Sequence, residues 1–296
     1  MDAAPEVARL SRYVAAPDGL RLHYLEYGAD AKATTVVVCL PGLSRTAEDF
    51  DVLARALAVS PSGRRRRVLS LDYRGRGLSD RDPDPMHYVL PTEHTDIVAT
   101  LDAASVASAI FIGTSRGGLH TMMMAAMRPE RLRAAVINDI GPVIERAGLV
   151  RIKGYVGKLP PLHSWDEAIS YLRRTVGANF TSLSAAEWET FAHLTYREED
   201  GRFSLPYDPQ LARPLDAVTA DSPMPDMWPQ FEALAKIPVL GIRGENSDIL
   251  SPEVFAEMAR RHPGFQAHVV AGQGHPPLLL DAPTIAVIEA FIAKAE

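Results

Sequence analysis

The sequence predicts an α/β fold, with a mostly parallel central sheet flanked by helices and a helical segment inserted into it. Continuous apolar runs alternate with helical stretches from residue 34 to residue 141, and strands that are apolar on both sides belong to a parallel sheet covered by helices. The alternation then stops and resumes at residue 237. A chain of 296 residues is long enough for one large core with such an insert.

The elements follow from the local patterns. Residues 11–27 alternate around Pro17-Asp18-Gly19, which predicts a hairpin. The expected strand–helix pairs before the insert are 34–40 with 46–59, 67–72 with 92–104, and 109–113 with 116–127, followed by a strand at 132–139. After the insert we expect a strand at 237–244, a helix at 251–261, a strand at 265–271 and a helix at 281–294.

The segment 141–230 has a different character. Ser164 with Glu167 and Ser184 with Glu187 each form the Ser-x-x-Glu pattern of a capping box, in which the two side chains cap the first turn of a helix. Each pattern opens a stretch with helical periodicity. The segment is therefore expected to be mainly helical.

We expect two structural parts, an α/β core at 1–140 and 231–296 and a helical cap at 141–230. All three tryptophans, Trp165, Trp188 and Trp228, fall in the cap. Open α/β sheets bind ligands at the carboxyl ends of their strands. The cap is therefore expected to cover a ligand site at that edge of the sheet.

The composition excludes several classes of partner. A net charge of −6 gives no general attraction to nucleic acid or to anionic membranes. The sequence shows neither a signal peptide nor an apolar run long enough to span a membrane, and its one cysteine, Cys39, suits a reducing cytoplasm. No His-x-x-His or Cys-x-x-Cys spacing suggests a metal. We expect a cytoplasmic protein that acts on a small molecule without metal or cofactor.

The stretch FIGTSRGGLH, residues 111–120, places Ser115 between a predicted strand and a predicted helix. A serine nucleophile must present its hydroxyl on a sharp turn there, and Gly113 and Gly117 remove the side chains that would collide. The pattern predicts Ser115 as a nucleophile. The amide of Arg116, at a helix N-terminus, is expected to stabilise an oxyanion.

A serine needs a base to accept its proton, and a histidine is suited to this near neutral pH. His275 lies in a glycine-rich loop after a strand, which predicts that it is the base. The histidine in turn needs a carboxylate that orients it. Asp248, Asp139 and Glu245 each follow a predicted strand closely enough to serve.

Five motifs together resemble the α/β-hydrolase family, and in particular its capped, cofactor-free serine hydrolases similar to carboxylesterases. They are LPGL (40–43), DYRGRGLSD (72–80), GTSRGG (113–118), RGENSD (243–248) and GQGHPP (272–277). The usual order of catalytic residues in this family favours Asp248 as the acid. The family pattern also makes the amide of Leu43 the second oxyanion donor. Pro41 replaces the common histidine but lies before Gly42, so this amide is retained.

The resemblance implies hydrolysis of a carboxylic ester through an acyl-enzyme. Two alternatives would use the same catalytic residues: a lactonase, and a hydrolase of carbon–carbon bonds in ring-cleavage products. A third alternative is a binding protein of the same fold without catalytic activity. Arg45 and Trp165 are the expected substrate contacts. Arg116 could also bind an acidic substrate, or form a salt bridge with a carboxylate of the cap.

Overall fold

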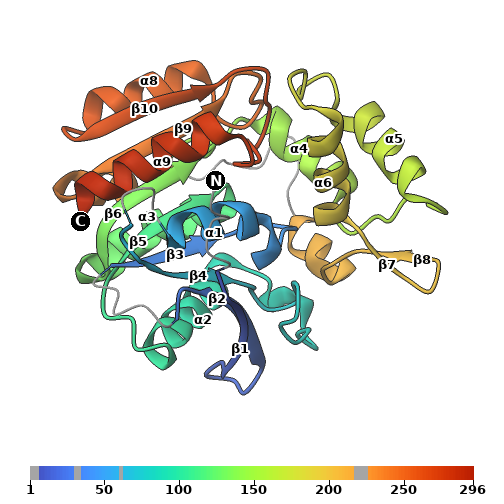
Figure 1. Ribbon diagram of the computed structural model, residues 1–296, viewed down its shortest axis with the longest axis horizontal. Coiled ribbons are helices and arrows are strands. Elements are labelled where there is room, and N and C mark those ends of the chain that lie inside the picture. Colours follow the sequence, from blue (N-terminus) through green and yellow to red (C-terminus); the bar gives the residue numbers. More distant parts are fainter. Residues whose placement is uncertain (1–6, 30–34, 60–62, 217–225) are drawn as a thin grey trace.

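The computed structural model describes residues 7–29, 35–59, 63–216 and 226–296, in which eight strands form one sheet (Figure 1). Their order is β1-β2-β4-β3-β5-β6-β9-β10. The strands are β1 (Arg9–Ala15), β2 (Arg21–Tyr27), β3 (Val36–Leu40), β4 (Arg67–Leu71), β5 (Ala109–Thr114), β6 (Leu132–Asn138), β9 (Val239–Gly244) and β10 (Phe265–Val270).

The strands from β4 to β10 are parallel, whereas β1 and β2 pair antiparallel at one edge. The predicted hairpin at 11–27 corresponds to β1 and β2, and the predicted strand at 34–40 to β3, although Thr34 itself lies outside the described residues. The predicted α/β class, with a mostly parallel sheet between helices, is confirmed.

Helices cover both faces of the sheet. On one face lie α1 (Asp51–Ala58) and α9 (Ala282–Ala295), and on the other lie α2 (Leu90–Ala103), α3 (Arg116–Met127) and α8 (Pro252–Arg261). Successive residues of a strand point to opposite faces. Val37 and Cys39 of β3 accordingly join the core under α1 and α9, while Val38 and Leu40 join the other core. Both sides of the strand are buried, which is why its sequence is continuously apolar.

The segment between β6 and β9 contains most of the remaining elements. They are α4 (Arg146–Tyr155), α5 (Trp165–Val176), α6 (Ala185–Thr195), the hairpin of β7 (Arg197–Glu199) and β8 (Arg202–Ser204), and α7 (Trp228–Glu232). Of these, α4, α5, α6, β7 and β8 are grouped beside the sheet in Figure 1, whereas α7 packs against α3. Short 3₁₀ turns occur at Ala47–Phe50, Pro85–His87, Pro129–Arg131, Pro209–Leu215 and Ala233–Lys236. The hairpin is a feature that the helical patterns of this segment did not indicate.

The helix starts in this segment agree with the capping patterns to different degrees. At α6 the Ser184 hydroxyl accepts a hydrogen bond from the Glu187 amide, and the Glu187 carboxylate accepts one from the Ser184 amide. At α5 the Ser164 hydroxyl caps the Glu167 amide, but the Glu167 carboxylate accepts from the amide of His163 instead. Both helices begin where the serines predict.

The inserted segment, residues 141–230, has a hydrophobic cluster of its own. The buried members of this cluster, which we call the insert core, are Leu162, Ala168, Leu172, Phe180, Trp188, Ala192 and Tyr196. The limits 141–230 remain a prediction, and residues 217–225 lie outside the described part of the chain. Among the helices that the structure describes, none is both long and apolar enough to cross a bilayer.

Candidate active site

Ser115 occupies a strained turn between β5 and α3. Its backbone φ of 51° and ψ of −112° lie outside the regions that residues with a side chain normally adopt. A Cβ on Gly113 would overlap the carbonyl oxygen of Gly117, and a Cβ on Gly117 would overlap that of Leu40. The turn therefore closes only because both positions are glycine, as the sequence pattern indicated.

Ser115, His275 and Asp139 form one hydrogen-bonded chain. The Ser115 Oγ lies 2.9 Å from His275 Nε2, and His275 Nδ1 lies 2.8 Å from Asp139 Oδ2. The His275 side chain is 3% exposed and that of Asp139 is fully buried. In this arrangement the imidazole can accept the serine proton while the carboxylate holds its other nitrogen.

Asp139 is placed by the end of β6. It follows the last residue of that strand with a positive φ of 56°, and its amide donates to the carbonyl of Ile242 on the neighbouring strand at 2.8 Å. Its Oδ1 accepts a hydrogen bond from the amide of Gly244 at 2.8 Å, which leaves Oδ2 for the imidazole. Both carboxylate oxygens thus have partners, as a buried charge requires.

The structure corrects the expected acid, because Asp139 rather than Asp248 contacts His275. Asp248 lies beyond β9, where helix α4 packs against its backbone and Arg151 binds its carboxylate. Burial would raise the pKa of Asp248, but the hydrogen bonds and charge of Arg151, together with the charge of His275 and a backbone hydrogen bond, outweigh it and hold the pKa below its usual value. Glu245, the third option, accepts a hydrogen bond from the amide of Gly272 at 2.7 Å.

The two amides expected to donate to an oxyanion belong to Leu43 and Arg116, and this role stays a prediction. Arg116 is the first residue of α3, and a Cβ on Gly42, which precedes Leu43, would lie 3.9 Å from the Ser115 Cβ. Among the described residues, neither the Leu43 amide nor the Arg116 amide has a hydrogen-bond acceptor within the protein. Unpaired amides beside a nucleophile can bind a developing negative charge.

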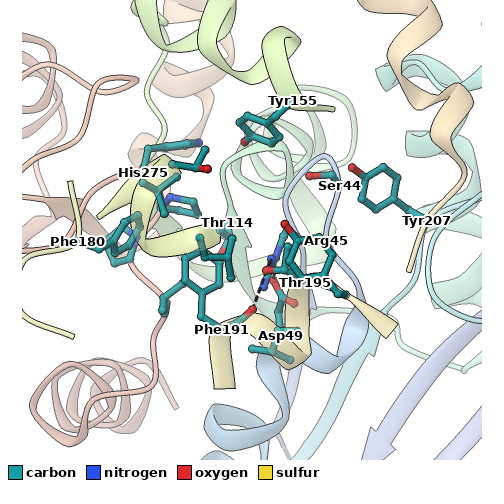
Figure 2. A pocket seen from close by; sticks show the side chains of 18 of the residues that line it. Ser44, Arg45, Asp49, Thr114, Tyr155, Phe180, Phe191, Thr195, Tyr207 and His275 are labelled. Atoms are coloured by element: carbon teal, nitrogen blue, oxygen red, sulfur yellow. Dashed lines mark hydrogen bonds and ion pairs between the residues drawn. The ribbon is translucent and has the colours of Figure 1, made fainter. Parts of the chain in front are cut away.

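A cavity of about 130 Å³ lies between the inserted helices and the end of the sheet, and it reaches His275 (Figure 2). Its lining is mixed. Aromatic side chains include Phe180, Phe191, Tyr155 and Tyr207, and the cations are Arg45, Arg151 and Lys158. Arg45, an expected substrate contact, lines this cavity, and its contact with a substrate stays a prediction.

Arg45 is held in place rather than free in the cavity. Its Nε donates to Asp49 Oδ2 at 2.5 Å, and its Nη1 donates to the hydroxyl of Thr195 on α6 at 2.9 Å. Its guanidinium also lies 5.4 Å from the ring centre of Phe191. Arg45 thus joins the loop after β3 to the inserted helices at the wall of the cavity.

Two other candidate binding residues, Trp165 and Arg116, do not line this cavity. Trp165 does not line the cavity, since its ring packs against His193, with centres 3.7 Å apart, and against Phe203. The Arg116 Nε donates to Glu93 at 2.6 Å. It does form a salt bridge, as the alternative proposed, but Glu93 belongs to α2 and not to the insert.

Sequence reasoning missed a buried polar cluster behind the elbow. Glu93 is fully buried and contacts Arg76, Arg116 and His120. The signal was available, because Glu93 shares the buried stripe of α2 with Ile97, where a charged residue needs a partner. The pattern does not reveal which cations supply that partner.

Among the described residues, no group of three or more His, Cys, Asp or Glu side chains is arranged to hold a metal ion. The prediction that the chain acts without a metal stays a prediction.

Similarity to known proteins agrees with the geometry. A model of the alpha/beta hydrolase family matches residues 37–290. The chain is 33% identical over 289 residues to a 3-hydroxybutyrate-oligomer hydrolase of Cupriavidus necator, covering 94% of this chain and 95% of that protein. It is 27% identical over 245 residues to the esterase YbfF of Escherichia coli, covering 81% and 85%.

The crystal structure of an alpha/beta hydrolase from Novosphingobium aromaticivorans has a TM-score of 0.88 and 38% identity, and the match covers 99% of this chain and 100% of that one. The resemblance stated from the motifs is thereby confirmed at the level of the family. The chain belongs to the alpha/beta hydrolase family and is a hydrolase.

Proposed function

We propose that the protein is a serine hydrolase that cleaves a carboxylic ester, with Ser115 as nucleophile, His275 as base and Asp139 as the orienting acid. The observation that carries the proposal is the hydrogen-bonded chain of these three side chains, with links of 2.9 and 2.8 Å. The same order of contacts serves acyl transfer on unrelated folds.

The first half of the reaction forms an acyl-enzyme. His275 Nε2 accepts the Ser115 proton as Oγ attacks the ester carbonyl, and the carbonyl oxygen becomes an anion bound by the amides of Leu43 and Arg116. Asp139 stabilises the imidazolium. When the tetrahedral intermediate collapses, the bond to the alcohol oxygen breaks, and His275 gives its proton to the leaving alcohol.

The second half restores the enzyme. His275 accepts a proton from water as the water oxygen attacks the acyl carbon, and the same two amides bind the oxyanion. Collapse breaks the bond to Ser115 Oγ, which takes back the proton from His275. The products are one carboxylic acid and one alcohol, and one water is consumed. No cofactor is required.

For the substrate we propose a short ester of a hydroxy acid that carries a free carboxylate. The relative with 33% identity is a hydrolase of 3-hydroxybutyrate oligomers, which are esters with a carboxylate end. Three cations line the cavity, and two of them, Arg45 and Arg151, are paired with Asp49 and Asp248, so Lys158 is the lining cation that binds no carboxylate among the described residues and supports this class. Lys158 is exposed and its Nζ donates to the carbonyl of Gly154, so it can meet a carboxylate at the cavity mouth.

Labelling and turnover together test the reaction. The parent protein should react with a fluorophosphonate probe and hydrolyse p-nitrophenyl butyrate, and Ser115→Ala should do neither while keeping the parent's melting temperature. Peptide mapping should place the probe on Ser115. A parent that is neither labelled nor active on any ester would contradict the proposal and favour a binding role.

A substrate panel tests the bond and the substrate class. The 3-hydroxybutyrate dimer should be a better substrate than its methyl ester, and Lys158→Met should raise KM several-fold for the dimer but not for the methyl ester. A γ-lactone and a ring-cleavage diketone acid represent the lactonase and carbon–carbon alternatives. Turnover of either one at a higher kcat/KM than any ester would replace the ester proposal.

A further inference from the structure

We infer that Glu93 is a positioning residue that fixes both proposed oxyanion donors, through Arg116 on one side and Arg76 on the other. The inference rests on the proposed function, because it assigns a role in the same reaction. Glu93 does not touch the reacting atoms. It would act by holding two segments of backbone at the distance that the oxyanion requires.

Glu93 lies in the first turn of α2, with its carboxylate fully buried. Its Oε1 is 2.7 Å from Nη1 of Arg76, and its Oε2 is 2.6 Å from Nε of Arg116. The same Oε2 is 3.2 Å from Nε2 of His120. One carboxylate thus binds side chains from three separate places along the chain.

The first link reaches the donor that follows the nucleophile. Arg116 is the first residue of α3, and its amide is one of the two proposed oxyanion donors. Its side chain is 13% exposed, and its guanidinium contacts Glu93 and donates to the carbonyl of Tyr88 at 3.3 Å. His120 lies one turn further along α3 and contacts the same carboxylate. Glu93 therefore holds the first turn of α3 by two side chains, next to the strained Ser115.

The second link reaches the loop after β3. Arg76 is fully buried, and while its Nη1 faces Glu93, its Nε donates to the carbonyl of Leu43 at 2.9 Å. The amide of Leu43 is the other proposed donor. Arg76 is further enclosed by the rings of Tyr73 and Tyr88, whose centres lie 5.5 and 5.6 Å from its guanidinium carbon. The Leu43 loop is therefore connected to Glu93 through one rigid side chain.

The charges of the cluster make the carboxylate necessary. Burial alone would raise the pKa of Glu93, but Arg116 and Arg76 outweigh it and hold the pKa far below its ordinary value. Without the anion, two guanidinium groups would face each other in a low-dielectric interior, where like charges repel strongly. We expect them to separate and to carry the Leu43 and Arg116 backbones with them. Displacement of a donor by a fraction of an ångström weakens transition-state binding more than substrate binding.

The test compares two variants of α2, in each of which a buried carboxylate is replaced by the corresponding neutral amide. In Glu93→Gln we expect kcat for p-nitrophenyl butyrate to fall by about one to two orders of magnitude with KM within twofold. A boronic acid, which forms a tetrahedral adduct on the serine, should lose affinity by a similar factor. The matched control is Asp96→Asn, because Asp96 lies on the same helix as Glu93 and forms a buried pair with Arg74, which is outside that helix. This variant should lower the melting temperature without changing kcat.

The outcomes separate a positioning role from a structural one. If Glu93→Gln and Asp96→Asn lose stability alike and keep the parent's kcat and boronate affinity, the inference is overturned. If Glu93→Gln does not fold, Arg116→Met serves in its place, because it removes only one link, at a partly exposed side chain. Arg116→Met should show the same selective loss of kcat. An unchanged kcat in this variant overturns the inference. A parent that fluorophosphonate does not label contradicts the proposed function itself.

Discussion

The carboxylate of Asp248 accepts two hydrogen bonds from Arg151, from Nε at 2.5 Å and from Nη2 at 2.8 Å. Arg151 belongs to α4 of the insert and Asp248 follows β9 of the sheet. The same helix is close to the backbone there, since the amide of Glu145 donates to the carbonyl of Ile249 at 2.9 Å. Asp248 thus joins the insert to the sheet, and the contact with His275 is left to Asp139.

The two aspartates should therefore respond differently to the same change. Asp139→Asn is expected to lower kcat by about four orders of magnitude, because an amide cannot stabilise the imidazolium or keep its tautomer. Asp248→Asn should change kcat less than fivefold and cost at most about 1 kcal/mol, because its pair is partly exposed. Steady-state kinetics of both variants on one ester show which aspartate supports His275. A greater loss in Asp248→Asn would restore the assignment that the sequence favoured.

A methyl group at Gly113 should disrupt the elbow. Gly113→Ala forces a Cβ against the backbone of Gly117, which no side-chain rotation relieves, so we expect a loss of about 2 kcal/mol or more and slower fluorophosphonate labelling. Gly154→Ala is the control, because a Cβ at this position of α4 meets no atom within 4 Å. It should be neutral or stabilise by about 0.5–1 kcal/mol. Equal melting temperatures for the two variants would contradict this account.

Phe191 and Trp165 are both partly buried aromatic residues of the insert, but only Phe191 lines the cavity. We expect Phe191→Ala to raise KM for p-nitrophenyl butyrate several-fold, because it removes apolar surface that the acyl chain would cover. Trp165→Ala should leave KM within twofold while lowering stability, since its ring packs on His193. A comparable rise of KM in both variants would show that Trp165 acts on the site.

Stability should fall between pH 7 and pH 5 because of His120. Burial lowers the pKa of His120 to about 4, so the folded protein keeps it neutral where the unfolded chain, with a pKa near 6.5, binds a proton. The unfolded state then holds more protons, and the free energy of unfolding decreases as the pH falls through this window. The full effect is at most about 3 kcal/mol.

His120→Gln keeps a donor for Glu93 but removes the titration. Urea unfolding at pH 7 and pH 5 should show a smaller decrease for this variant than for the parent. His94, whose pKa burial also lowers, is present in both proteins and contributes to both decreases. The same decrease in parent and variant would show that His120 is not a source of the pH dependence.

Much of the fold and two of the site residues could be predicted because their signals are local. Ser115 follows a buried strand and is flanked by glycines that the turn requires, and His275 lies in a glycine-rich loop after another strand. The alternation of apolar runs with helical patterns is likewise readable from short windows. Both residues lie where that reading placed them, in contact with each other.

Short stretches of sequence could not show which aspartate contacts His275. Asp139 and Asp248 both follow sheet strands, and what separates them is the packing of α4 on residue 248, nearly a hundred positions away from Arg151. The place of Trp165 was hard to predict for a related reason, since aromatic residues of an inserted segment pack against its own core as readily as they line a cavity. Contacts between distant segments decide both cases, and no periodicity encodes them.

The insert core has a consequence for how this enzyme can diversify. Its buried members all fall between residues 162 and 196, but Leu278, three residues after His275, packs against them, so a substitution in this core also reaches the loop that carries His275. Because Leu172, Phe180 and Tyr196 of this core also line the cavity together with His275, changes in their size are expected to alter substrate acceptance and the position of the His275 loop together.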